Sequence, residues 1–134
     1  MENNISVTGI LGNVAFATQN ISESFTVIAD EPTEKGGANT GPTPQTLLCM
    51  SLASCTAITL RMYAQRKAWA LGEIRVEINL LTDESGNKKF VRKITTEESV
   101  TAEQMDRLLM VADKCPVHKI LFQANTIETQ WLAS

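Results

Sequence analysis

The sequence contains no run of eighteen apolar residues, so we expect no segment that crosses a membrane. It also lacks an excess of positive charge, because 12 Lys and Arg residues stand against 15 Asp and Glu residues, for a formal net charge of -3. Nucleic acids and anionic membrane surfaces attract basic proteins, so this balance argues against both as partners. Residues 1–6 are polar and acidic, whereas a signal peptide opens with a basic region followed by apolar residues; we therefore expect no signal peptide.

Cysteine is scarce, and three cysteines in 134 residues do not suit the disulfide framework of a secreted protein. We therefore expect a cytoplasmic protein, because in the reducing cytoplasm a cysteine pair is more often redox-active or catalytic than structural. The length and an apolar fraction of 43% are ordinary for a globular protein, and they predict one domain over residues 1–134.

The longest predicted element is a helix that begins after Thr43. Pro44 suits a first helical position with Thr43 as the cap, and no further proline or glycine occurs before Gly72, where we expect the helix to stop. Its apolar residues recur at helical spacing and predict one buried face. We expect this helix to be central, with a sheet wrapped onto it. The residues of the predicted buried face are Leu48, Leu52, Cys55, Ile58, Thr59 and Met62.

Strands are predicted on both sides of this helix. Residues 5–30 hold three short alternating runs separated by turn residues, which indicates an antiparallel meander. Residues 30–44 are rich in Gly and Pro and predict a structureless loop, of a length that is more often functional than accidental. Residues 73–80 alternate strictly between apolar and polar side chains and predict a strand, which residues 88–96 pair with.

The C-terminal third is predicted to be helical and then extended. Thr101 and Gln104 fit a capping box, followed by a stripe that contains Met105, Leu108, Leu109 and Ala112. Pro116 ends this helix and can open a short one through residue 122, and residues 126–131 predict a closing strand. Strand groups and helices in this segregated order indicate an α+β fold.

The three cysteines have different local settings. Cys49 and Cys55 lie about 120° apart around one helix, so they cannot pair, and Cys49 is best interpreted as a small buried hydrophobe. Taken alone, Cys55 is also a core residue, and a thiolate there would need a cation or hydrogen-bond donor from elsewhere in the fold. Cys115 precedes Pro116 and would cap the short helix, where free amide groups favour an anion. Cys115 is thus the better local candidate for a lowered pKa, with an inert turn residue as the alternative.

We expect neither a metal nor an organic cofactor. A zinc site from Cys115, His118 and the other cysteines is formally possible, but the spacing of Cys49 and Cys55 matches no paired-ligand pattern. His118 stands alone beside Lys119 and is expected to be an exposed or capping side chain. The glycines of the loop lack the spacing of a phosphate-binding motif.

Several motifs together resemble the OsmC/Ohr family. The resemblance runs from about Asp30 to the end of the chain and is nearest to the uncharacterised OsmC-like branch. It implies an α+β OsmC-like fold in which an antiparallel sheet wraps around a long central helix, as an intertwined homodimer with two sites at the subunit interface. The motifs are Gly36-Gly37, Gly41-Pro42-Thr43-Pro44, the helix segment 53–64 with Cys55 followed by Thr-Ala, and Lys114-Cys115-Pro116-Val117-His118.

The resemblance also implies a cysteine-based peroxidase that reduces organic hydroperoxides. Cys55 would be the peroxidatic thiolate, which becomes a sulfenic acid, and Cys115 the resolving thiol, which condenses with it to a disulfide. This disulfide needs Cα atoms within about 7 Å of each other. The expected partners are a second copy of the chain, a small-molecule hydroperoxide, and an external dithiol that reduces the disulfide.

Two departures from the family's pattern bear on activity. Active members use an arginine from the N-terminal strands and a glutamate at the start of the long helix, but here no arginine precedes Arg61 and Gln45 stands at the glutamate's position. Gln45 can form hydrogen bonds but no ion pair. Lys35 is a possible substitute cation, whereas Arg61 lies on a different helix face from Cys55. The alternative function is therefore a dimer that binds a small apolar or electrophilic ligand with little or no turnover.

Overall fold

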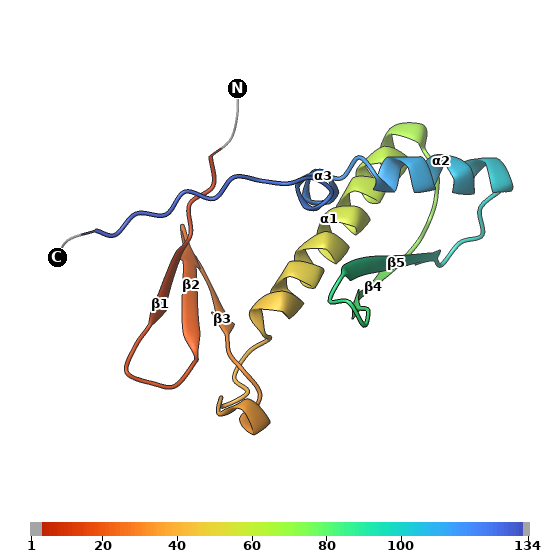
Figure 1. The fold of residues 1–134 in the computed structure, drawn as a ribbon. Coiled ribbons are helices and arrows are strands. Elements are labelled where there is room, and N and C mark those ends of the chain that lie inside the picture. The colour runs from red at the N-terminus through yellow and green to blue at the C-terminus, as the bar shows by residue number, and fades with distance from the viewer. Residues whose placement is uncertain (1–3, 133–134) are drawn as a thin grey trace. The chain divides into compact units, whose positions relative to one another are not determined.

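The computed structural model describes residues 4–132, and the chain divides into two compact units, Met1–Met50 and Ser51–Ser134 (Figure 1). The boundary falls inside the longest helix, α1 (Pro44–Lys67). Antiparallel sheets and helices occur together, with α1 at the centre of the element order, so the predicted α+β class is confirmed. A single domain over residues 1–134 stays a prediction.

The first unit holds a three-stranded antiparallel sheet. Its strands are β1 (Thr8–Leu11), β2 (Thr18–Ser22) and β3 (Phe25–Ala29), in the spatial order β1-β2-β3. Consecutive strands are neighbours, so the predicted meander is confirmed. Ser22 pairs with Phe25, which leaves a tight two-residue turn between β2 and β3.

Asp30 organises the segment between β3 and α1. Its buried carboxylate accepts hydrogen bonds from the backbone N–H groups of Glu31, Ala38 and Thr40, and from the Thr40 hydroxyl at 2.6 Å. The segment is a loop, as predicted, except for a short 3-10 helix, η1 (Thr33–Lys35). A polar side chain that satisfies several backbone donors can hold a segment that is neither helix nor strand.

Two glycines of the same segment permit close approaches between backbone segments. A Cβ atom at Gly37 would lie 2.0 Å from the carbonyl oxygen of Glu31, and one at Gly41 would lie 2.2 Å from that of Ile28. No other residue fits such contacts without movement of the backbone. The glycine motifs noted in the sequence therefore have a structural cause.

Helix α1 begins at Pro44, as predicted, and the Thr43 Oγ1 atom accepts the N–H of Thr46 at 3.2 Å. Its length and composition alone would allow α1 to cross a membrane, but core helices of soluble proteins meet the same two criteria. A core helix is mostly buried, whereas 22% of the 18-residue apolar window of α1 is buried within the chain. The absence of a membrane-spanning segment stays a prediction.

Helix α1 ends at Lys67, earlier than the predicted stop at Gly72. Ala68 takes up a left-handed conformation with φ of 57°, and the N–H of Trp69 bonds the carbonyl oxygen of Ala64 at 2.9 Å. This hydrogen bond belongs to a helix-terminating motif in which glycine usually occupies the left-handed position, here taken by Ala68. Gly72, with φ of 67°, lies in the bend before the next strand.

The face of α1 that is buried within the chain differs from the predicted face. Ile58 and Met62 are more than half exposed, and Leu52 alone of the predicted set is buried. The apolar residues of α1 are spread around most of the helix, so their periodicity alone does not indicate which face packs within one chain. The residues that are buried follow each other at intervals of four: Leu52, Thr56, Leu60 and Ala64.

The core of the second unit lies between α1, α2 (Ala102–Ala112) and a two-stranded antiparallel sheet (Figure 1). The strands are β4 (Ile74–Thr82) and β5 (Lys88–Thr96), close to the predicted spans. The side chains buried in this core are Leu60, Ala64, Leu71, Leu108, Val111 and Ala112, with Ile74 and Ile94 packed against them.

The predicted capping box of α2 is confirmed, because Thr101 and Gln104 each accept the other's backbone N–H through their side chains. The predicted stripe was wrong in part. Met105 and Leu109 are about half exposed and line a surface hollow, while Val111 is buried.

The last element is α3 (Pro116–Leu121), close to the predicted short helix. The predicted strand over 126–131 does not form in the described part of the chain. A strand needs a partner for its backbone groups, and the large side chains of Ile127, Trp131 and Leu132 are almost fully exposed.

Candidate thiol site

Cys55 and Cys115, far apart in the sequence, come together in the second unit. Cys55 lies in the middle of α1 and is half-buried, and its thiol forms a hydrogen bond with the thiol of Cys115. Cys115 is the N-cap of α3 and is fully buried. All three cysteines of the chain are free thiols. Two neighbouring thiols can interconvert with a disulfide when their geometry permits it.

The N-terminus of α3 supplies hydrogen-bond donors to both sulfurs. The Cys115 Sγ atom accepts the backbone N–H of His118 at 3.2 Å, as its predicted capping position requires. The backbone N–H of Val117 donates to the Cys55 sulfur. These amide groups have no partner within the helix, because they belong to its first turn. Cys55 thus receives a donor from outside its own helix, which a thiolate at the middle of a helix needs.

Burial raises the pKa of the Cys55 thiol above the ordinary value of 9.0, and the hydrogen bond and charge of Cys115 act in the same direction. The Val117 N–H and the Thr59 hydroxyl oppose this shift without cancelling it. The Cys55 thiol is therefore protonated near neutral pH, as expected from the lack of the family's arginine and glutamate.

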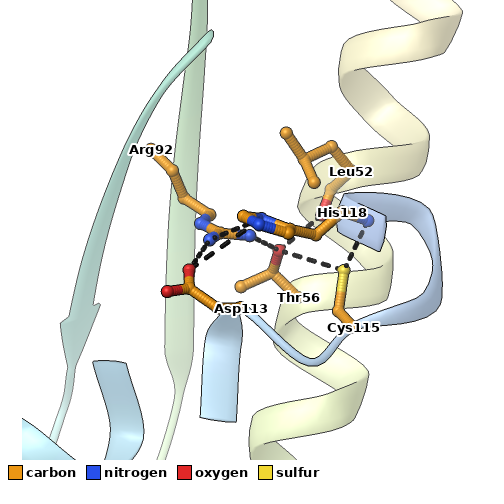
Figure 2. A network of polar contacts seen from close by, with 6 residues as sticks. All are labelled: Leu52, Thr56, Arg92, Asp113, Cys115 and His118. Atoms are coloured by element: carbon orange, nitrogen blue, oxygen red, sulfur yellow. Dashed lines mark hydrogen bonds and ion pairs between the residues drawn. The ribbon is translucent and has the colours of Figure 1, made fainter. Parts of the chain in front are cut away.

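Arg92 on β5 joins this site, although it is not among the site residues expected from the sequence (Figure 2). The guanidinium Nη1 donates to the Thr56 Oγ1 atom at 3.1 Å, while Nη2 donates to the Asp113 Oδ1 atom at 2.9 Å. Nη2 also donates to the His118 Nδ1 atom at 3.1 Å. Only 14% of the Arg92 side chain is exposed. The sequence carries a signal for this residue. Side chains two positions apart lie on the same face of a strand, so Arg92 shares the inner face of β5 with the apolar residues at positions 90 and 94.

Thr56 connects Arg92 with Cys115. Its hydroxyl donates to the Leu52 carbonyl oxygen at 2.7 Å, and the same Oγ1 atom lies 3.9 Å from the Cys115 Sγ atom (Figure 2). A hydroxyl has one hydrogen, so with that hydrogen committed to Leu52 the Oγ1 atom acts as acceptor toward Arg92 and Cys115. The guanidinium therefore lies one side chain away from the Cys115 sulfur.

His118 differs from its predicted role as an exposed or capping side chain. Its ring is three-quarters buried and stacks on Phe122 with a centroid distance of 5.6 Å. A guanidinium only donates hydrogen bonds, so the contact with Arg92 requires a lone pair on Nδ1 and places the ring proton on Nε2. His118 thus accepts a hydrogen bond from Arg92 in this network.

The other candidates lie outside the network. Lys35 is exposed in η1 of the first unit, and Gln45 is exposed in the first turn of α1. Arg61 donates to the carbonyl oxygen of Gly72, which agrees with the expectation that it does not reach Cys55. Cys49 is half-buried, so its predicted burial is only partial. Among residues 4–132 no group of three or more His, Cys, Asp or Glu side chains could hold a metal ion.

A surface cavity of about 410 Å³ borders the network. Arg92 and His118 form part of its wall, which combines apolar and basic side chains and contains no acidic one. An apolar wall with a few polar groups is typical of a small-molecule site. The lining residues are Leu52, Lys88, Lys89, Phe90, Arg92, His118, Leu121 and Phe122.

Known proteins resemble this chain in sequence and in fold. An OsmC-like protein from Mycoplasma pneumoniae superposes with a TM-score of 0.72 at 20% identity, over 91% of this chain and 89% of its own. The organic hydroperoxide resistance protein OsmC from Legionella pneumophila gives 0.64 at 15% identity, over 89% of both chains. The organic hydroperoxide resistance protein OhrB of Bacillus subtilis gives 0.59 at 24% identity, over 87% of this chain and 89% of its own.

These identities support a shared fold and nothing finer. A comparison with curated proteins gives no match. The family model described as OsmC-like protein matches residues 36–130, which include both cysteines of the site and Arg92. The chain therefore belongs to the OsmC-like protein family.

Proposed function

We propose that the protein is a thiol-dependent peroxidase that reduces organic hydroperoxides through Cys55 and Cys115. The observation that carries the proposal is the hydrogen-bonded contact of these two thiols at the N-terminus of α3. Membership of the OsmC-like family supports it. Two solved structures with the same fold are named as organic hydroperoxide resistance proteins, and this agrees with the proposed substrate class.

The reaction begins when the Cys55 thiol loses its proton to solvent. The thiolate attacks the distal peroxide oxygen; an S–O bond forms, the O–O bond breaks, and the alkoxide takes up a proton to leave as an alcohol. The sulfur is oxidised to a sulfenic acid while the peroxide is reduced. The Cys115 thiol then attacks the Cys55 sulfur, an S–S bond replaces the S–O bond, and water leaves. An external dithiol reduces the disulfide by exchange and becomes oxidised itself.

Cys55 is the better candidate for the first step because of its accessibility. Its side chain is half-buried, whereas Cys115 has no exposed surface. The Val117 N–H would stabilise the negative charge of a thiolate at the Cys55 sulfur. The raised pKa of Cys55 keeps the thiolate fraction small at neutral pH, so the proposed enzyme is slow there.

The test is the consumption of cumene hydroperoxide with dithiothreitol or dihydrolipoamide, the reduced form of lipoamide, as reductant. We expect turnover by the wild-type protein and none above background by Cys55→Ser. Without the reductant, Cys115→Ser should consume one equivalent and accumulate oxidised Cys55 in place of the disulfide. Cys49→Ser is the matched control and should behave as wild type, because Cys49 is not part of the thiol site. Equal rates of hydroperoxide consumption by wild type and Cys55→Ser would contradict the proposed peroxidase activity.

We further propose that the working form is a cytoplasmic homodimer. Large apolar side chains are exposed on α1 and on the C-terminal segment, among them Met62, Ile127 and Trp131. Extensive exposed apolar surface is typical of a subunit interface. Light scattering should give a mass of twice the 14.7 kDa of one chain. A monomer at micromolar concentration would contradict the dimer.

A second candidate function is the binding of a small apolar or electrophilic ligand without turnover. The cavity beside the network and the raised pKa of Cys55 favour it. Calorimetric titration with cumyl alcohol tests for an apolar site independently of catalysis. Saturable binding by a protein that consumes no hydroperoxide would establish this second function.

A further inference from the structure

One side chain ties together the two segments that carry the cysteines. Thr56, which accepts from Arg92, directly follows Cys55 on α1. Asp113 and His118, which also accept from Arg92, stand on either side of Cys115. Arg92 itself comes from β5 and belongs to neither segment (Figure 2). Its three bonds therefore fix the position of one cysteine segment relative to the other.

The geometry of the contacts requires an arginine. A guanidinium is planar and presents its N–H groups in a rigid fork, whereas the ammonium of lysine is a compact charge on a flexible stem. Nη1 points to Thr56 and Nη2 is shared by Asp113 and His118. Only 14% of the Arg92 side chain is exposed. Its bonds to Thr56 and His118 are partly buried, whereas its bond to Asp113 is exposed, and buried hydrogen bonds hold a geometry more firmly than exposed ones.

The stability of the unit rests mainly on other residues. The hydrophobic core lies between Leu60, Leu71 and α2, and the Arg92 network is not part of it. Asp113 is 67% exposed, and an ion pair with such a partner contributes little to folding stability. The network is therefore better explained by the placement of the cysteines than by the stability of the fold.

Placement matters because a sulfenic acid on Cys55 has two competing fates. Condensation with the Cys115 thiol gives a disulfide and water. Reaction with a second hydroperoxide molecule gives a sulfinic acid and an alcohol, and the thiol enzyme is then lost. The rate of condensation depends on how often the Cys115 sulfur lies within bonding reach, whereas the rate of over-oxidation depends on hydroperoxide concentration.

Resting on the proposed peroxidase, we propose that Arg92 is a positioning residue for the resolving step. By holding Asp113 and His118 against Thr56, it keeps the Cys115 thiol beside Cys55, so that condensation precedes attack by a second hydroperoxide. The hydrogen bonds of Arg92 go to Thr56, Asp113 and His118, so we assign it no part in the first attack.

The test separates the two steps. Arg92→Met removes the guanidinium but keeps an apolar stem, and Arg92→Lys keeps the charge without the fork. Arg75→Met is the matched control, because Arg75 lies on the neighbouring strand β4, is 74% exposed and pairs only with Glu73 among the described residues. Dimedone trapping follows the sulfenic acid, and mass spectrometry of intact protein follows the disulfide and the sulfinic acid.

We expect Arg92→Met to lose the Cys55 thiol at a rate within about threefold of wild type but to form the disulfide at least tenfold more slowly. Sulfinic acid should then accumulate at hydroperoxide concentrations that leave wild type intact. Arg92→Lys should lie between the two, and Arg75→Met should match wild type. A wild-type partition between disulfide and sulfinic acid in Arg92→Met overturns the proposal.

Two further measurements keep the outcome decisive. If Arg92→Met does not fold, Asp113→Ala takes its place, since the Asp113 side chain is 67% exposed and its ion pair should contribute little to folding stability. A partial shift toward sulfinic acid is expected. An unchanged partition in that variant also overturns the proposal. Equilibration with oxidised dithiothreitol measures the effective concentration of the two thiols without hydroperoxide, and Arg92→Met should lower it at least tenfold. If the wild type consumes no hydroperoxide but Arg92→Met still lowers the effective concentration of the two thiols, the result contradicts the peroxidase and leaves the positioning role of Arg92 standing.

Discussion

The Cys115 Sγ atom accepts the backbone N–H of His118 at 3.2 Å, and the neighbouring N–H of Val117 donates to Cys55. One short helix thus provides hydrogen bonds to sulfurs from two distant parts of the chain. Pro116 suits the first helical position, and the amides of the next two residues are free for the thiols because they belong to the first turn of the helix.

Hydroperoxide treatment should consume two of the three thiols of the chain. Cys55 and Cys115 are in contact and can form one disulfide, while Cys49 lies about 120° from Cys55 around α1. Thiol titration under denaturing conditions gives the count. Cys49→Ser should then retain none of its two thiols, and loss of all three in the wild type would contradict the pairing.

Alkylation of Cys55 by iodoacetamide should be slow at pH 7 and rise through pH 9 and above. The raised pKa means that the folded protein keeps this proton to higher pH than an ordinary thiol, so fewer than about 1% of molecules hold the thiolate at pH 7. The stabilisation linked to this proton is fully present below pH 9 and is lost as pH rises through the higher folded-state pKa. Peptide mapping of the labelled protein gives the profile for each cysteine.

In the Cys115→Ser variant the alkylation profile of Cys55 should shift to lower pH. The hydrogen bond and the charge of Cys115 both raise the pKa of Cys55, and serine does not ionise in this range. The shift should be partial, because burial of Cys55 is the larger cause. A profile unchanged from wild type would show that the two thiols do not titrate together.

Gly37→Ala should lower the free energy of unfolding by about 1–3 kcal/mol, the usual cost of forcing extra atoms into a packed site. The new methyl group would lie 2.0 Å from the Glu31 carbonyl oxygen, so the backbone would have to move. Gly12→Ala is the control, since nothing lies within 4 Å of its added atom. Urea denaturation measures both, and equal midpoints for the two variants would contradict the close approach.

Asp30→Asn should lower the Tm by several degrees at pH 7. The Thr40 hydroxyl and backbone amides lower the pKa of Asp30, so the folded state favours the ionised carboxylate. This stabilisation is present above the ordinary pKa of 3.8 and is lost as the pH falls through the lower folded-state pKa. The difference in Tm between wild type and variant should therefore shrink toward pH 2. Glu34→Gln, an exposed substitution in η1, is the control.

Features with a local cause could be predicted from the sequence. The start of α1 at Pro44 and the capping box at Thr101 depend on side chains within a few positions of each other, and both are present as predicted. The role of Cys115 as a helix cap follows from Pro116 in the same way.

Features set by distant contacts could not be predicted in this way. Alternation along β5 indicates that Arg92 faces inward, but its position at the thiol site depends on contacts with residues of α1 and α3. The choice of the Leu52–Ala64 face of α1 depends equally on its packing partners, because several faces of that helix are apolar. The contact of Cys55 with Cys115 was expected from family resemblance and not from spacing.

The complete burial of Cys115 has a consequence for how a Cys55–Cys115 disulfide would be reduced. A dithiol arriving from solvent could attack only the sulfur of Cys55, so Cys115 would be the leaving group, and the amide of His118 already donates to it. The transient mixed disulfide would therefore form on α1 and never on α3, and the regeneration of the protein would have a fixed direction.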